Sequence, residues 1–169
     1  AGPATLHFRY SAGISERSSA GVFESRDSGN KYLLTQFEST DARRAFPCFD
    51  QPNFKTPWQL TLHVRKEDGA FSNTPQLSAA NEPNGMKKVV FKESKPLPSY
   101  LVAIAVGPFD VVGWDGIPRS TVRDTPIPLR GFTSKGKGNQ IRYALSHTGA
   151  LLRRLEEYFG IPYPFEKLD

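Results

Sequence analysis

The sequence predicts a mainly β protein that ends in one long α-helix. Glycine and proline number 14 each among the 169 residues, a density that interrupts helices and favours short strands joined by turns. Alternating apolar and polar residues recur through the first three-quarters of the chain, as they do in half-buried strands. Near residue 140 the apolar spacing changes to a helical period. Charged residues make up 23% of the chain, a proportion typical of a folded globular domain.

Nine strands are expected in the β region. They are placed at 6–10, 21–25, 31–37, 56–65, 89–91, 100–106, 109–114, 121–123 and 127–132. In 6–10 apolar residues alternate with His7 and Arg9, and in 31–37 Tyr32, Leu34 and Gln36 share one face. The segment 100–106 shows no alternation, so we expect it to be covered on both faces.

The helix is expected over about 140–159. From Ile141 onwards, apolar residues recur at i, i+3, i+4 and i+7 and form one broad stripe. Gly160 is placed to end the helix, and Pro162 cannot continue it. The stripe has no helical partner in the chain, so it needs a sheet or missing sequence to cover it. For its second half we expect exposed apolar surface, self-association of the chain, or a displaced helix. That half consists of Leu151, Leu152, Leu155 and Phe159.

Composition narrows the function classes. The net charge of +5 is scattered along the chain and forms no basic stripe with stacking aromatics, which argues against nucleic-acid binding. No apolar run reaches the roughly 18–20 residues that a membrane helix needs. The single Cys48 cannot form an intrachain disulfide and leaves the compartment open, so localisation stays unknown. His7, His63 and His147 do not have the spacing of a zinc site, and we expect them to be solvated or packed.

The segment from Thr35 to Pro52 carries the most chemical information. Gln36 and Glu38 stand two residues apart on an extended chain, so both point to the same side. A carboxylate and an amide that flank Phe37 in this way can bind a cation or an amine. The alternative is a polar strand end with a solvated glutamate.

Further along this segment, a short helix and an ion-pair cluster are expected. Ser39, Thr40 and Asp41 offer an N-cap for a short helix that runs through Ala45. Two arginines and two aspartates lie in or near that helix and can form ion pairs. They are Arg43 and Arg44 on one side and Asp41 and Asp50 on the other. Cys48 is expected to pack between Pro47 and Phe49.

The stretch TQFESTDARRAFPCFDQPNFK closely resembles the signature of the M1 family of zinc aminopeptidases, the group of aminopeptidase N and leukotriene A4 hydrolase. Other segments agree with the family in the same order. They are 71–73 (FSN), 98–103 (PSYLVA), 106–109 (VGPF), 158–164 (YFGIPYP) and 167–169 (KLD). The resemblance covers roughly residues 5–169.

The resemblance implies a saddle-like β-sandwich N-terminal domain followed by the opening of a thermolysin-like catalytic domain. Residues 1–133 would form the β domain, incomplete at its start, and 134–169 would begin the catalytic domain, with its truncated helix at about 140–159. In this family the Gln-x-Glu pair reaches the active site. Carried over, Glu38 would bind the free α-amino group of a peptide, and Gln36 would line the pocket for the first side chain. Glutamate at position 38 favours the aminopeptidases over the epoxide-hydrolase branch.

Several family motifs are missing from the chain. It lacks the Gly-x-Met-Glu-Asn motif, and it lacks the His-Glu-x-x-His zinc motif. The resemblance therefore implies an internal fragment of a zinc aminopeptidase, with the zinc ligands beyond Asp169. We expect the fragment to bind no zinc and to be inactive alone. Its expected partners are the N-terminus of a peptide substrate and the remainder of the catalytic domain.

Two other functions stay open. One is a family member that has lost catalysis and acts as a scaffold, although an amine anchor at Glu38 would then have no use. The other is a free-standing β-sandwich module that binds carbohydrate or protein through Trp58 and Trp114. The parity of Trp58 within its strand favours packing in the core.

Overall fold

The computed structural model describes residues 2–169, which form four small antiparallel sheets, short 3-10 helices and one long α-helix. The largest sheet has four strands in the order β1 (Gly21–Asp27), β2 (Asn30–Gln36), β9 (Ile104–Gly107) and β5 (Gly69–Ser72). The three-stranded sheet has the order β4 (Thr61–Arg65), β7 (Met86–Phe91) and β6 (Gln76–Glu82). Two strand pairs complete the sheets: β3 (Lys55–Thr56) with β8 (Leu97–Pro98), and β10 (Asp110–Ile117) with β11 (Ile127–Thr133). The 3-10 helices are η1 (Ala42–Arg44), η2 (Ser99–Leu101) and η3 (Gly138–Ile141), and the α-helix is α1 (Arg142–Phe159).

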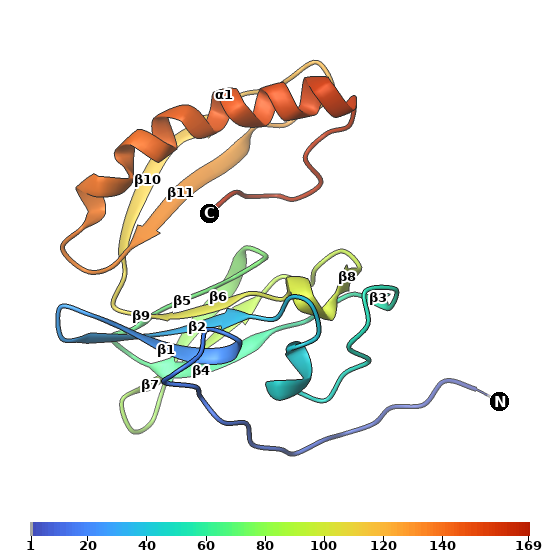
Figure 1. The fold of residues 1–169 in the computed structure, drawn as a ribbon, viewed down its shortest axis with the longest axis vertical. Coiled ribbons are helices and arrows are strands. Elements are labelled where there is room, and N and C mark those ends of the chain that lie inside the picture. The colour runs from blue at the N-terminus through green and yellow to red at the C-terminus, as the bar shows by residue number, and fades with distance from the viewer. Residues whose placement is uncertain (1) are drawn as a thin grey trace.

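Helix α1 lies along the β10–β11 ribbon, and together they form a layer above the other sheets (Figure 1). Leu145 and Leu152 on the helix pack against Ile117, Ile127 and Leu129 on the ribbon, and all five are buried. The two-stranded ribbon can bury one face only because the helix covers it.

The C-terminal segment after α1 returns to the ribbon. The helix ends at Gly160, whose φ of 66° is left-handed, as expected for a glycine C-cap. Leu168 then forms a parallel bridge with Leu129, in which its N–H donates to Pro128 O at 2.9 Å and its carbonyl accepts from Arg130 N at 3.1 Å. The segment thereby lies beside β11 as a third extended segment of the ribbon.

A buried ion pair holds α1 to the loop between β10 and β11. Arg123 Nε donates to Glu156 Oε1 at 2.7 Å, and the two side chains are 5% and 2% exposed. Arg123 also donates to the carbonyls of Pro118 and Thr125, while Glu156 Oε1 accepts from Tyr163 N at 2.9 Å. The hydrogen bonds from Arg123 hold the pKa of Glu156 at about 2. Because both charges are compensated by hydrogen bonds, the pair can be buried.

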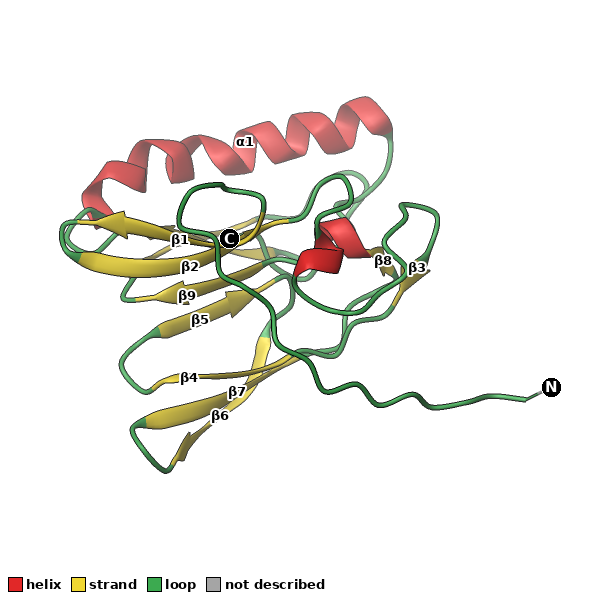
Figure 2. Cartoon of the chain, turned by 60° about the horizontal axis from the view of Figure 1, so that its bottom comes forward, coloured by secondary structure: helices red, strands yellow, loops and turns green. Residues whose placement is uncertain are grey.

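Polar contacts across large sequence separations connect the helical layer to the four-stranded sheet. The hydroxyl of Tyr32 on β2 accepts from Lys135 N at 2.9 Å, across 103 residues. Lys137 pairs with Asp27 at the end of β1 at 2.5 Å. The side chain of Lys167, from the C-terminal segment, donates to Ser72 O on β5 at 2.7 Å. Figure 2 shows the resulting arrangement, with α1 and the four-stranded sheet on the same side of the molecule.

Most of the expected elements are confirmed. Strands form at 21–27, 30–36, 61–65, 86–91, 104–107, 110–117 and 127–133, and the helix forms where the apolar period predicted it. The mainly β fold with one C-terminal helix is therefore established. The expected boundary at residue 133 stays a prediction, and α1 shares its core with β10 and β11, which precede that boundary.

Two strand predictions are wrong, and two others are correct only in part. Segment 6–10 forms no strand, and its apolar residues Leu6 and Phe8 are 75% and 64% exposed, because no strand among residues 2–169 pairs with it. Segment 121–123 forms only an isolated bridge, between Ser120 and Arg123. The segment 100–106 is only partly a strand, because η2 occupies its first residues and β9 begins at Ile104. The segment 56–65 is also divided, because β3 ends at Thr56 and β4 begins at Thr61. Strands β5, β6 and β8 were not anticipated.

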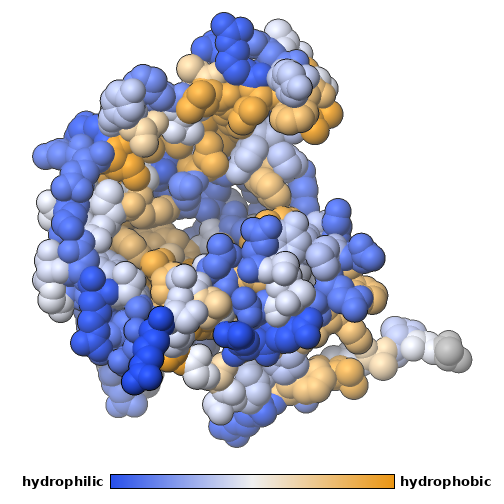
Figure 3. All heavy atoms as spheres, viewed as in Figure 1, coloured by the Kyte–Doolittle hydropathy of each residue, from blue (hydrophilic) through white to orange (hydrophobic). Residues whose placement is uncertain are grey.

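The apolar stripe of α1 is only partly covered, as expected. Leu152 is 9% exposed, whereas Leu151, Leu155 and Phe159 are 63%, 53% and 63% exposed. Apolar side chains gather in the region of α1 at the top of Figure 3. None of the helices formed by residues 2–169 combines the length and the apolar character that crossing a membrane requires.

Candidate functional site

Gln36 and Glu38 lie at the end of β2, on either side of a buried aromatic residue. Phe37 is 1% exposed, whereas its two neighbours are exposed, which matches the alternation expected from the sequence. The backbone N–H of Glu38 donates to Gln36 Oε1 at 3.2 Å. Upstream, the Thr35 hydroxyl accepts from Ile104 N at 2.9 Å, which joins β2 to β9 just before the pair. The two polar side chains therefore stand on a backbone that is fixed on both sides.

Phe37 sits in a small core built by the two 3-10 helices that flank it. Ala42 of η1 and Val102, directly after η2, are buried in the same cluster. Phe46 packs edge-on against the Phe37 ring, with the ring centroids 5.6 Å apart. The carbonyl of Phe37 accepts from Asp41 N at 2.9 Å, so the chain turns immediately after Glu38.

Asp50 connects these two helices through its carboxylate. Oδ2 accepts from both the backbone N–H and the Nε of Arg43 in η1, each at 3.0 Å. Oδ1 accepts from the hydroxyl of Ser99 in η2 at 2.5 Å. Burial alone would raise the pKa of Asp50, but the hydrogen bonds from Ser99 and Arg43 lower it below its usual value. The Arg43–Asp50 pair was expected from the sequence, but the Ser99 contact was not, because 49 residues separate the partners.

The other ion pair expected in this segment also forms. Arg44 Nε lies 2.8 Å from Asp41 Oδ1. Asp41 occupies the N-cap position of η1, but its side chain makes no capping hydrogen bond, so the predicted cap is only positional.

Glu38 differs from the paired carboxylates around it. Its carboxylate takes part in none of the ion pairs that form among residues 2–169. An exposed carboxylate on a fixed backbone, beside an amide, is suited to accept charge-assisted hydrogen bonds from a ligand cation. The geometry is therefore compatible with the amine binding that the sequence suggested.

A cavity of about 410 Å³ opens between the four-stranded sheet and the C-terminal segment. It begins at Leu34 and Thr35 on β2, directly before Gln36, and Figure 3 shows the molecule hollowed between its upper and lower layers. Its walls are mainly apolar and aromatic. They include Phe71, Ile104, Phe132, Tyr163 and Phe165.

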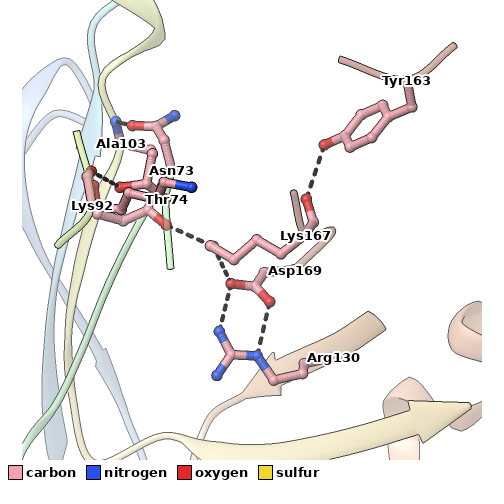
Figure 4. Close-up of polar contacts among 9 residues, drawn as sticks. Asn73, Thr74, Lys92, Ala103, Arg130, Tyr163, Lys167 and Asp169 are labelled. Carbon is pink, nitrogen blue, oxygen red and sulfur yellow. Dashed lines mark hydrogen bonds and ion pairs between the residues drawn. The ribbon is translucent and has the colours of Figure 1, made fainter. Parts of the chain in front are cut away.

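The polar side chains at the edge of this cavity are already hydrogen-bonded (Figure 4). Lys167, 8% exposed, donates to Ser72 O and to Asp169. Arg130 binds Asp169 through two hydrogen bonds, each 2.9 Å long. Burial would raise the pKa of Asp169, but the hydrogen bonds from Arg130 and Lys167 lower it. The cavity therefore presents its apolar wall to an occupant, with its charges compensated internally.

The remaining candidates from the sequence have structural contacts. His63 pairs with Glu82 at 2.7 Å, and His147 Nδ1 lies 2.8 Å from Tyr143 O one helical turn back. Residues 2–169 contain no group of three or more His, Cys, Asp or Glu side chains able to hold a metal ion. Burial raises the pKa of the Cys48 thiol, which packs beside the Phe37 core.

The two tryptophans expected as possible stacking platforms are packed. Trp58 donates from Nε1 to Leu97 O at 2.9 Å and lies against Phe46, with the ring centroids 5.4 Å apart. Trp114 packs against the core between α1 and the ribbon. The packing role expected for Trp58 is therefore confirmed.

Comparison with known proteins agrees with these features. Residues 1–101 match the model of the peptidase M1 N-terminal domain. The chain is 42% identical over 148 residues to aminopeptidase M1-B of Oryza sativa subsp. japonica, an alignment that covers 87% of this chain and 16% of that protein. It is 36% identical to the puromycin-sensitive aminopeptidase of Caenorhabditis elegans, over 87% of this chain and 15% of the relative. It is 30% identical to the human endoplasmic reticulum aminopeptidase 1, over 99% of this chain and 17% of the relative.

These comparisons identify the family, and they show how much of the length of its members the chain covers. The chain spans roughly a sixth of the length of these three curated relatives, all of which are named aminopeptidases. The family model covers β1 to η2, the part of the fold that contains Gln36, Glu38 and the Phe37 core. The chain therefore belongs to the peptidase M1 N-terminal domain family.

Proposed function

We propose that this chain is the substrate-anchoring part of a zinc-dependent aminopeptidase that removes N-terminal amino acids from peptides. In this proposal Glu38 binds the α-ammonium group of the peptide, and Gln36 lines the pocket for its first side chain. The family and the names of the relatives support the reaction class. An anionic group that binds the free ammonium explains why such an enzyme would act only at the N-terminus of its substrate.

The observation that carries the proposal is the exposure of the Glu38 carboxylate next to a buried, fixed Phe37. Its carboxylate is exposed and outside every ion pair among residues 2–169, while Phe37 beside it is fully buried. A solvated glutamate at a frayed strand end would need no such anchor. A carboxylate that must meet a substrate ammonium gains affinity when its backbone is fixed in advance.

Zinc belongs to the proposal as a component of the full-length enzyme. Residues 2–169 hold no cluster of potential metal ligands, and the ligands are proposed to come from the remainder of the catalytic domain. The chain alone is accordingly proposed to be inactive on peptides. The same remainder is proposed to cover the exposed stripe of α1, and the isolated chain to self-associate through that stripe when the cover is absent.

The experiment is a comparison of variants in the full-length protein. Glu38→Ala should lower kcat/KM for an alanyl chromogenic substrate by about 10- to 100-fold, because a hydrogen bond to a charged group contributes about 1.5–3 kcal/mol. Glu67→Ala, which removes an exposed carboxylate from the turn between β4 and β5, is the matched control and should leave kcat/KM unchanged. Equal kinetics for Glu38→Ala and the unmodified enzyme would remove Glu38 from the site.

A further inference from the structure

Asp50 joins two segments that are far apart in the sequence. Oδ2 holds η1 through the backbone N–H and the Nε of Arg43, and Oδ1 holds η2 through the hydroxyl of Ser99. Its main-chain carbonyl also accepts from Arg43 Nη2 at 3.0 Å. Asp50 is 4% exposed and Ser99 is 2% exposed, so the contact between these two side chains is shielded from water, whereas the Arg43 side chain is 59% exposed. Shielded, charge-assisted hydrogen bonds of this kind are strong and directional.

The segments held by Asp50 are those that enclose Phe37. Ala42, next to Arg43, is fully buried in the Phe37 core. Val102, whose N–H donates to Ser99 O at 3.1 Å, is buried in the same core from the other side. A shift of either 3-10 helix would therefore change the position of the Phe37 ring. Because Gln36 and Glu38 are bonded directly to Phe37, their side chains would move with it.

We propose that Asp50 is a positioning residue that sets the orientation of Glu38 through the two helices around Phe37. The proposal rests on the proposed function, in which Glu38 binds the substrate ammonium. Asp50 is only 4% exposed, so we propose that it acts through its contacts with the two helices and not through contact with a ligand. Its effect on the reaction is confined to ligands that carry the amine, because only these use the Glu38 carboxylate.

This restriction separates a positioning role from a purely structural one. If Asp50 only stabilised the fold, its loss would weaken the binding of every active-site ligand to the same degree. If it orients Glu38, its loss should weaken ligands with an α-amino group and spare otherwise identical ligands without one. Small misplacements of a binding group can cost up to about 100-fold, so a measurable partial loss is expected.

The experiment measures inhibition constants of the full-length enzyme for leucine hydroxamate and for its des-amino counterpart, 4-methylpentanoic hydroxamate. Asp50→Asn is the main variant, since an asparagine is uncharged and has a single acceptor oxygen, so Ser99 and Arg43 can no longer both donate to this side chain. Ser99→Ala is the second variant and releases only η2. Asp68→Asn is the matched control, because Asp68 is equally buried at 5% exposure and binds Arg65 at 2.8 and 3.1 Å, but lies outside the Phe37 core.

Each variant has a defined expectation. Glu38→Ala serves as the reference and should weaken leucine hydroxamate about 10- to 100-fold, with little change for the des-amino compound. Asp50→Asn should also weaken leucine hydroxamate selectively, but only by about 3- to 10-fold, since it displaces the Glu38 carboxylate without removing it. Asp68→Asn should change the ratio of the two inhibition constants by less than twofold.

Four results would overturn the inference. Equal weakening of both hydroxamates by Asp50→Asn, or no weakening of either, would refute the positioning role and leave the proposed function intact if Glu38→Ala is selective. A Glu38→Ala enzyme that loses affinity for neither compound would refute the proposed function, and the inference with it. If Asp50→Asn does not fold, Ser99→Ala decides, and an unchanged ratio in that variant would refute the role of the two helices.

Discussion

Both side chains of the ion pair between Arg123 and Glu156 are almost fully buried, and this pair allows a quantitative test of how α1 is held. The perturbation is Glu156→Gln, which keeps the size of the side chain and removes its charge. Arg123 would then stay buried with two carbonyl partners, those of Pro118 and Thr125, and no anion. Removing one partner of a buried pair typically costs about 3–5 kcal/mol, because the other charge is left uncompensated.

The assay is urea unfolding of the chain, followed by circular dichroism at pH 7. With a typical dependence of about 1–3 kcal/mol per molar urea, the expected loss moves the midpoint down by at least about 1 M. Glu157→Gln is the control, because Glu157 is the next residue on the same helix and pairs with Arg154 at 3.1 Å on the surface. Exposed pairs of this type contribute about 0–1 kcal/mol, so its midpoint should barely move.

The pH dependence of the unfolding free energy provides a second test of the Arg123–Glu156 pair. The pKa of Glu156 is about 2 in the folded chain against an ordinary value of 4.5, so the folded state binds the proton less readily than the unfolded state. Its contribution to stability is therefore complete above pH 4.5 and is lost as the pH falls towards 2. The difference in unfolding free energy between the unmodified chain and Glu156→Gln should shrink over this range. A Glu156→Gln chain as stable as Glu157→Gln at pH 7 would refute the reasoning.

Three further predictions concern packing. Replacing Leu151 and Leu155 by Lys should lower the self-association of the isolated chain, which sedimentation velocity measures. The unfolding free energy should change by less than about 1 kcal/mol, because both side chains are more than half exposed. Gly131→Ala should cost about 1–3 kcal/mol in thermal or urea unfolding, since a Cβ there would lie 2.6 Å from Ile141 Cδ1. Lys167→Met should speed amide hydrogen exchange at the bridge between β11 and the C-terminal segment, and unchanged exchange would show that this lysine does not hold the segment.

Local patterns predicted those elements whose burial is periodic. Helix α1 was found because it buries one face, and strand β2 was found from the spacing of Tyr32, Leu34 and Gln36. The same two-residue spacing predicted that Gln36 and Glu38 point to one side, and both are exposed with buried Phe37 between them. The sequence did not predict strand β6, because this strand is exposed along nearly its whole length and shows no alternation of apolar and polar residues. The strand expected at 6–10 failed for the opposite reason. Its alternation is clear, but a strand also needs a partner, and the pattern carries no information on pairing.

The candidate site was predictable in its local part only. The Arg43–Asp50 pair joins residues seven apart, and the charges alone suggested it. The Ser99 hydroxyl and the cover from Val102 come from a segment about 50 residues further on, where a serine and a valine are chemically unremarkable. These contacts depend on how the sheets assemble, and only the three-dimensional fold brings the residues together.

The long sequence separations of these contacts also set an order of events during synthesis. Strand β2 emerges early, but β9, which pairs with it, ends at Gly107, and the Thr35–Ile104 hydrogen bond closes 69 residues. Loop closure of this length is entropically costly and slows folding relative to local contacts. Strand β2 and Glu38 are thus expected to leave the ribosome long before the segments that contact them have been synthesised. Nascent chains arrested before β9 should leave Phe37 open to proteases and chaperones, and chains extended past it should bury that residue.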